Sequence, residues 1–388
     1  MDEVGFRYVH PIDEAALEAM LSKCKQAFPG AGALVLLPEA EAHRIPEVQS
    51  AARRAGVPIL GGVFPKLILE GRFVGEGAWL FRLEEAPAYG IVDDLSGSED
   101  AVAQRIAETI HPALDARALR DGRDPKALPE AESLFLMVDA TTPNTASILS
   151  ALYLELGTAV HYLGVSAGSE TFKPIPCVFD AERVCRGLLW FFASPEKKTL
   201  LLHDYSPASG ASVATSASGN RIASIDFRPA FDFYRERVRE RYGIELTREN
   251  FYQYAVEYPL GIQLASGQMV VRMPVGLDED GSIYCAGEVP EHALLTIVQA
   301  PSPGSNKTAH MLARRLAEES VSRLMLMFYC AGRRLRLGAE SEQDLGNLVN
   351  VAGATVGGAI TLGEIGSVDG MYPVFHNGAF VCVGWGRA

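Results

Sequence analysis

Short apolar runs, each bounded by turn residues, recur along most of the chain. Runs of Val, Leu, Ile, Met and Phe occupy residues 33–37, 57–60, 133–138, 159–163 and 324–329. Runs of four to eight apolar residues between turn signals are typical of strands buried on both faces. The pattern therefore predicts a core of buried β-strands.

Amphipathic stretches lie between these runs and predict helices. Apolar residues recur every three to four positions in 12–28, 45–55 and 145–156, and a Gly or a Pro-Gly pair follows each stretch. Strands that alternate with helices of this length indicate an α/β fold. Gly-rich hairpins, such as the turn at 278–281, favour mixed β-sheets over purely parallel ones. We therefore predict mixed β-sheets layered with helices in two lobes.

The order strand, helix, strand, Gly-rich turn, strand occurs twice in the first lobe, in residues 33–83 and 133–202. A connection at 86–130, rich in Asp, Ser, Pro and Arg, separates the two copies. A fixed order that recurs predicts an internal duplication. We place the first lobe at 1–250 and the second at 251–388, where the same order of elements returns.

Composition and charge narrow the classes of function. The 388 residues are 48% hydrophobic with a net charge of −13, so a large core is expected and general binding to nucleic acid or anionic membranes is not. The six cysteines are scattered without a CxxC pair, which favours reduced thiols. Neither a signal peptide nor a membrane-spanning run of apolar residues is present, so a cytoplasmic protein is expected. The oligomeric state stays open.

Several functional side chains gather at strand ends near the C-terminus, namely Cys330, Arg333, Glu364, His376 and Asn377. An Arg side chain offers a planar fork of donors that suits a carboxylate, and a Glu can pair with an ammonium group. The set therefore predicts a pocket for a small polar, amino-acid-like ligand. In the alternative interpretation, Arg333 and Glu364 form a buried structural ion pair and Cys330 fills the core.

A Gly-rich loop after a buried strand is a second candidate for this pocket. Gly164, Ser166 and Gly168 would let backbone N–H groups approach a ligand. The alternative is a tight turn that serves only the fold.

Residues of this chain are also compatible with other chemistries. Cys330 with His376 is compatible with a thiolate nucleophile, against which stands an inert buried thiol. His203 could bind haem iron, although no CxxCH motif is present. No spacing of His, Cys or Asp matches a zinc or calcium site, so we predict no metal.

The chain resembles the FIST family, a two-part sensory module, over roughly 30–385. The resemblance rests on Tyr258-Pro259-Leu260-Gly261, on Cys330-Ala331-Gly332-Arg333, on Gly363-Glu364-Ile365-Gly366, on Phe375-His376-Asn377 and on the loop 164–168. It implies a cytoplasmic protein that senses small molecules such as amino acids, and some members bind haem. Because the resemblance leaves few residues for an output domain, it also implies either a signalling partner protein or a use of the pocket other than signalling within the chain.

Overall fold

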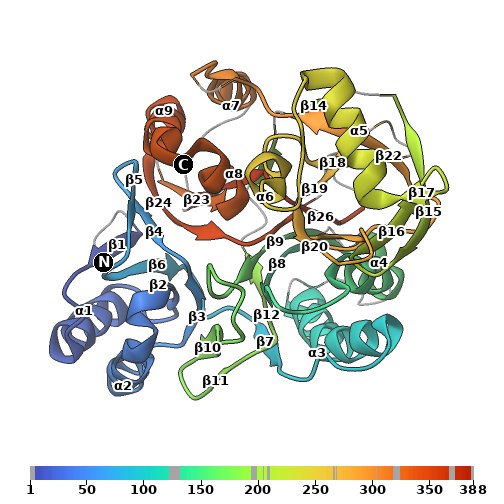
Figure 1. The fold of residues 1–388 in the computed structure, drawn as a ribbon. Coiled ribbons are helices and arrows are strands. Elements are labelled where there is room, and N and C mark those ends of the chain that lie inside the picture. The colour runs from blue at the N-terminus through green and yellow to red at the C-terminus, as the bar shows by residue number, and fades with distance from the viewer. Residues whose placement is uncertain are drawn as a thin grey trace.

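The fold is α/β, as predicted, with mixed sheets flanked by helices (Figure 1). The computed structural model describes residues 5–120, 122, 132–193, 199–203, 205–207, 210–264, 267, 269–302, 304–317, 324–366 and 372–385. Within these ranges, three six-stranded sheets and one nine-stranded sheet are formed.

Three α/β units share one order of elements: edge strand, helix, strand, helix, strand, hairpin, strand. The first unit contains β1 (Phe6–Val9), α1 (Glu14–Ala27), β2 (Gly32–Pro38), the 3-10 turn η1 (Glu39–Arg44), α2 (Ile45–Ala55), β3 (Ile59–Phe64), β4 (Leu67–Leu69), β5 (Arg72–Val74) and β6 (Ala78–Leu83). The second contains β7 (Tyr89–Val92), α3 (Glu99–Arg120), β8 (Glu132–Asp139), α4 (Thr145–Leu156), η2 (Gly157–Ala159), β9 (Val160–Ala167), β10 (Val178–Asp180), β11 (Val184–Cys185) and β12 (Leu188–Ala193). The third contains β13 (Thr199–Leu202), α7 (Lys307–Ala317), β23 (Leu324–Cys330), α8 (Ala331–Leu337), η3 (Gly338–Glu340), α9 (Ser341–Ala352), β24 (Thr355–Thr361), β25 (Glu364–Gly366), β26 (Val374–His376) and β27 (Phe380–Trp385).

Each unit completes its sheet with a hairpin from another unit. The strand orders are β1-β6-β2-β3-β10-β11, β7-β12-β8-β9-β25-β26 and β13-β27-β23-β24-β4-β5. The hairpin β10–β11 of the second unit thus joins the sheet of the first unit. In the same way, β25–β26 of the third unit joins the second sheet, and β4–β5 of the first unit joins the third sheet. This cyclic exchange, with β3, β9 and β24 in mutual contact, arranges the three units around one centre (Figure 1).

A glycine in the second parallel strand of each unit permits close strand pairing. A Cβ atom at Gly61 would lie 2.4 Å from the Val35 carbonyl oxygen, and one at Gly164 would lie 2.2 Å from the Leu136 carbonyl oxygen. The corresponding distance at Gly358 is 1.7 Å. Because no real side chain tolerates such distances, these three positions require Gly.

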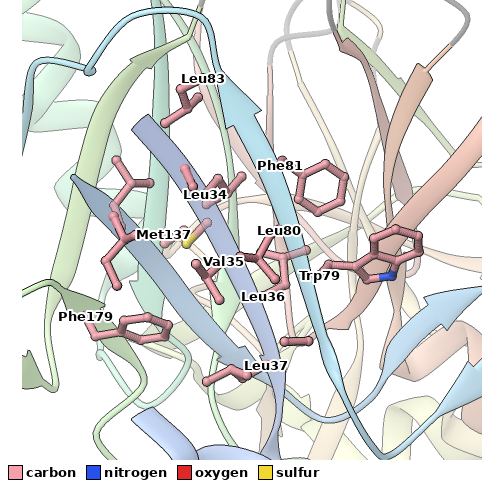
Figure 2. Packing of buried hydrophobic residues seen from close by; sticks show 14 of the residues in the cluster. Leu34, Val35, Leu36, Leu37, Trp79, Leu80, Phe81, Leu83, Met137 and Phe179 are labelled. Atoms are coloured by element: carbon pink, nitrogen blue, oxygen red, sulfur yellow. The ribbon is translucent and has the colours of Figure 1, made fainter. Parts of the chain in front are cut away.

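The common core joins residues from different units. Figure 2 shows apolar side chains of β2 and β6 together with Met137 of the second unit and Phe179 of its exchanged hairpin. Near the centre, the Phe328 ring lies 5.7 Å from that of Phe64 and 5.8 Å from that of Phe135. The three units therefore share one hydrophobic core, and its packing fixes their relative positions.

An antiparallel insert separates β13 from α7 in the third unit. Its elements are β14 (Ser206–Pro207), β15 (Ser212–Ser218), β16 (Arg221–Ile225), β17 (Arg228–Pro229), α5 (Ala230–Tyr242), α6 (Phe251–Ala255), β18 (Leu260–Gln263), β19 (Met269–Arg272), β20 (Pro274–Leu277), β21 (Ile283–Cys285) and β22 (Leu294–Gln299). The insert has its own core, to which α5 contributes Phe231, Phe233 and Tyr234. The charged α5 thus buries one face in this core.

Pairing between strands crosses the predicted division at residue 250. Strands β4 and β25 come from opposite sides of that position, yet each pairs with a strand from the other side. The two-lobe division therefore stays a prediction.

The connection 86–130 contains β7 and the long helix α3, and its residues 121 and 123–130 lie outside the described ranges. Within those ranges no helix has the length and apolarity to cross a membrane.

Candidate ligand-binding cleft

The structure brings four of the predicted site residues together at buried strand ends. Glu364 and His376 lie opposite each other in the β25–β26 pair. Cys330 ends β23, and its Sγ accepts a hydrogen bond from the Gly378 N–H at 3.1 Å. Asn377 Oδ1 accepts from the Met273 N–H at 3.3 Å, which joins this cluster to the insert. All four side chains are at most 4% exposed, so the cluster is closed to solvent.

Glu364 is a buried acid, and no ion pair joins it to a cation within the part of the chain that the structure describes. Burial raises the pKa of Glu364 to about 8, against hydrogen bonds from Thr361 and Cys330 that lower it. Thr361 Oγ1 lies 2.7 Å from Oε1, and the Ala379 N–H reaches Oε2 at 3.4 Å. Glu364 is therefore largely protonated at neutral pH and carries no charge for an ammonium group.

His376 is a neutral imidazole. Burial, followed by the charges of His203 and Arg272, lowers the pKa of His376 to about 3. Neither ring nitrogen reaches a partner in normal hydrogen-bonding geometry within the described chain. The neighbouring His203 ring has its centroid 6.3 Å away.

Cys330 has the environment of an inert thiol. Burial and the nearby Glu364 raise the pKa of Cys330 well above its ordinary value, so the thiolate is disfavoured at neutral pH. A role as a nucleophile activated by His376 would need a lowered pKa of the Cys330 thiol.

Thiol labelling measures this difference directly. Of the six thiols, only Cys185 is half-buried. We expect a maleimide reagent to label Cys185 in the folded protein and Cys330 only as fast as the chain opens. Mass spectrometry of tryptic peptides over time reports both rates. Labelling of Cys330 as fast as Cys185 would restore the enzyme hypothesis.

Arg333 does not join this cluster, which corrects the predicted pairing with Glu364. The chain turns into the short helix α8 after Cys330, and the side chain points toward α7 and α9. Its Nε and Nη2 donate to the two carboxylate oxygens of Asp344 at 2.9 and 2.8 Å, and Nη2 also donates to Thr308. The adjacent hollow, about 20 Å³, holds about one water molecule. Arg333 thus forms a structural ion pair, but with Asp344.

The loop 164–168 mainly continues the strand pairing. The Ser166 N–H donates to the Gly363 carbonyl at 2.8 Å, and its carbonyl accepts from Leu362 at 3.2 Å. Gly168 has a φ of +141°, and a Cβ atom at this position would lie 3.6 Å from the side chains of Leu362 and Ala140. Its backbone therefore supports two residues of the cavity described next.

A cavity of about 250 Å³ opens between the start of α4 and the insert. Its polar lining comes from the 140–145 turn, from Asn220 and from Glu288. Its apolar lining comes from Phe172, Val275, Leu362 and Phe375, among others.

A second cavity of about 180 Å³ lies on the other side of Glu288 and Phe375, which line both. It is lined by Ala146, Ser147, Ser150, Ile262, Leu264, Val270, Arg272, Glu288, Pro290, Tyr372, Pro373, Val374 and Phe375. We call the two cavities together the α4 cleft.

Glu288 holds the two sides of the α4 cleft together. Its carboxylate oxygens accept hydrogen bonds from the Ala146 and Ser147 N–H groups at 2.9 and 2.8 Å. These amides belong to the first turn of α4, where the helix dipole favours negative charge. Asn144, the N-cap residue of α4, forms no capping hydrogen bond with its side chain. Glu288 therefore caps the helix, although it lies 142 residues away from Ala146 in the sequence.

Sequence reasoning missed the α4 cleft. All eight predicted site residues lie in the described ranges, and none lines either of its cavities. Two charged residues signalled it: Arg272 within the apolar run 269–273, and Glu288 between Gly287 and Val289. A charge inside an apolar strand is costly and marks a special environment.

Haem coordination through His203 Nε2 would cost an existing contact. This nitrogen lies 3.1 Å from the Met269 carbonyl oxygen, in hydrogen-bonding distance, and coordination would break that contact. His203 lines none of the three cavities described above. Within the described ranges, no three His, Cys, Asp or Glu side chains are placed to hold a metal ion.

Comparison with protein families gives two adjoining matches. Residues 33–228 match the FIST N domain, and residues 230–367 match the FIST C domain. A comparison with curated proteins gave no match. The α4 cleft lies between the two matched parts, with α4 in the first and β19 and Glu288 in the second.

Proposed function

Since the chain belongs to the FIST family, we propose that it is a sensory protein that binds a small polar ligand in the α4 cleft. FIST domains are generally described as small-ligand sensory domains in signal transduction. We place the protein in the cytoplasm and propose that its output passes to a partner protein.

The position of the α4 cleft carries this proposal. The cavity of about 250 Å³ has the volume of about eight water molecules, which suits a ligand of amino-acid size. It combines apolar walls with a few polar groups, among them Asn144, Asn220 and Glu288, as ligand sites do.

A ligand in this position would act on the contact between the two FIST parts. It would touch the first turn of α4 on one side and the insert on the other. A ligand shifts a conformational equilibrium only through unequal affinity for the two states. Contacts on both sides of the cleft supply such a difference, since separation of the insert from α4 would break one set of them.

A thermal-shift screen over amino acids and small organic acids tests the proposal. A compound present at 100 times its Kd should add about 2.7 kcal/mol to the free energy of unfolding. Ala286→Leu fills the larger cavity and should abolish the shift for ligands bound there. Ala113→Leu, on α3 and away from the cleft, is the matched control and should keep it. If no compound shifts the melting temperature, or if every shift survives both Ala286→Leu and Ala146→Leu, which fills the smaller cavity, this function is wrong.

A further inference from the structure

Arg272 is a buried cation whose hydrogen bonds within the described chain all go to backbone carbonyls. It lies in β19 and is 3% exposed. Its Nε donates to the Glu288 carbonyl at 2.7 Å, and its Nη1 donates to the carbonyls of Phe375 and Val271 at 2.8 and 3.2 Å. These bonds hold the guanidinium in one orientation between the insert and β26. Among the described residues, no carboxylate forms a direct ion pair with this guanidinium.

The charge of the Glu288 carboxylate favours the Arg272 cation, but only from beyond ion-pair distance. Both of its oxygens are turned to the amides of α4, and it forms no ion pair with Arg272 within the described chain. The third guanidinium nitrogen, Nη2, makes no hydrogen bond to any residue that the structure describes. A buried charge without a paired group is unfavourable. An anion beside Nη2 would offset this cost.

The space beside Arg272 limits the size and type of that anion. Arg272 lines the smaller cavity of the α4 cleft, whose volume of about 180 Å³ equals about six water molecules. Ile262, Leu264, Val270 and Val374 form apolar walls there. Since Glu288 lines the same cavity, a monoanion is favoured over a doubly charged phosphate.

We propose that the smaller cavity of the α4 cleft is a subsite for a small monocarboxylate with a short apolar chain, bound by Arg272. This subsite rests on the proposed function and names the ligand class for it. The carboxylate would accept hydrogen bonds from Nη2, and the apolar chain would pack on Ile262, Leu264 and Val270.

Isothermal titration with matched probes tests the subsite. The probes are 3-methylbutanoate, its amide, leucine and inorganic phosphate. The acid and the amide have nearly the same shape, so the difference between them isolates the negative charge. We expect the acid to bind about tenfold more tightly than the amide or more, and phosphate to bind more weakly than the acid. An amide that binds as tightly as the acid would overturn the subsite, and so would phosphate that binds more tightly. Leucine shows whether the site also accepts an α-ammonium group; binding tighter than that of the acid would refute the apolar-acid class.

Two variants test separately the guanidinium of Arg272 and the volume of the smaller cavity. Arg272→Lys keeps a positive charge but loses the planar fork, and should weaken the acid about tenfold while the amide changes little. Ala146→Leu fills the smaller cavity, leaves Arg272 intact and should abolish binding of both. Unchanged affinity for the acid in either folded variant contradicts the subsite. If Arg272→Lys does not fold, Ala146→Leu and the comparison of acid with amide still decide.

The two proposals fail differently. If none of the four probes binds, but other compounds shift the melting temperature and Ala286→Leu abolishes that shift, only the carboxylate subsite is wrong. If the whole screen is negative, both are wrong.

Discussion

Arg333→Ala is expected to lower the free energy of unfolding by about 3–5 kcal/mol, because it removes one partner of a buried ion pair. The Arg333 side chain is 3% exposed and that of Asp344 is 19% exposed, so water compensates the remaining carboxylate only in part. Asp344 would keep the Tyr329 hydroxyl bond at 2.7 Å and lose both guanidinium bonds. Denaturant unfolding followed by circular dichroism measures the loss.

Arg334→Ala is the matched control. This neighbouring arginine pairs with Glu170 at the surface, where an ion pair contributes about 0–1 kcal/mol. Ligand-induced shifts in melting temperature should survive in Arg333→Ala, because Arg333 lies outside the α4 cleft. A loss of stability no larger than that of Arg334→Ala would refute the structural role. Loss of ligand binding in a folded Arg333→Ala protein would return Arg333 to the binding site.

Glu364→Gln is expected to stabilise the protein increasingly as the pH rises. The ordinary pKa of 4.5 applies to the unfolded chain, and burial raises the pKa of Glu364 in the folded chain to about 8. Between these values the folded state binds the proton more tightly, so folding takes up a proton. The loss of folding free energy that Glu364 causes therefore grows by about 1.4 kcal/mol per pH unit between these two pKa values. It is absent well below pH 4.5 and levels off above about pH 8. Glutamine has a similar shape and no charge, and it removes this cost.

Unfolding titrations of both proteins at pH 5, 6, 7 and 8 check this prediction. The difference between variant and parent should be smallest at pH 5 and grow by several kcal/mol toward pH 8. The comparison at pH 5 is the internal control, since Glu364 is protonated in the folded state there. A difference that stays constant over the series would show that Glu364 titrates normally and that the cluster around Cys330 is open to water.

Local pattern sufficed for most elements of the fold. The helix at 145–156 has its predicted bounds because its apolar spacing and the following Gly157 are local signals. The repeated order of elements was visible in both predicted lobes, and the three units that carry it have the same sheet order. The cyclic exchange of hairpins was not predictable, since pairs such as Leu67 with Ala359 are encoded by packing between distant segments.

The candidate site was harder to predict for the same reason. Cys330 and Arg333 follow the same strand, but the turn into α8 directs Arg333 to Asp344 and leaves Cys330 beside Glu364. Sequence proximity suggested a shared role that the intervening helix prevents. Glu288 reaches α4, and Arg272 reaches β26, through hydrogen bonds across more than a hundred residues. Their charge within apolar surroundings was visible in the sequence, and their partners were not.

A crystal structure of the protein with the strongest ligand from the thermal-shift screen tests the sensory proposal most directly. We expect electron density for the ligand in the α4 cleft, between the first turn of α4 and the insert. A carboxylate ligand should place an oxygen within hydrogen-bonding distance of Arg272 Nη2. Density at any other place, with the α4 cleft holding only water, would contradict a ligand site between the two FIST parts.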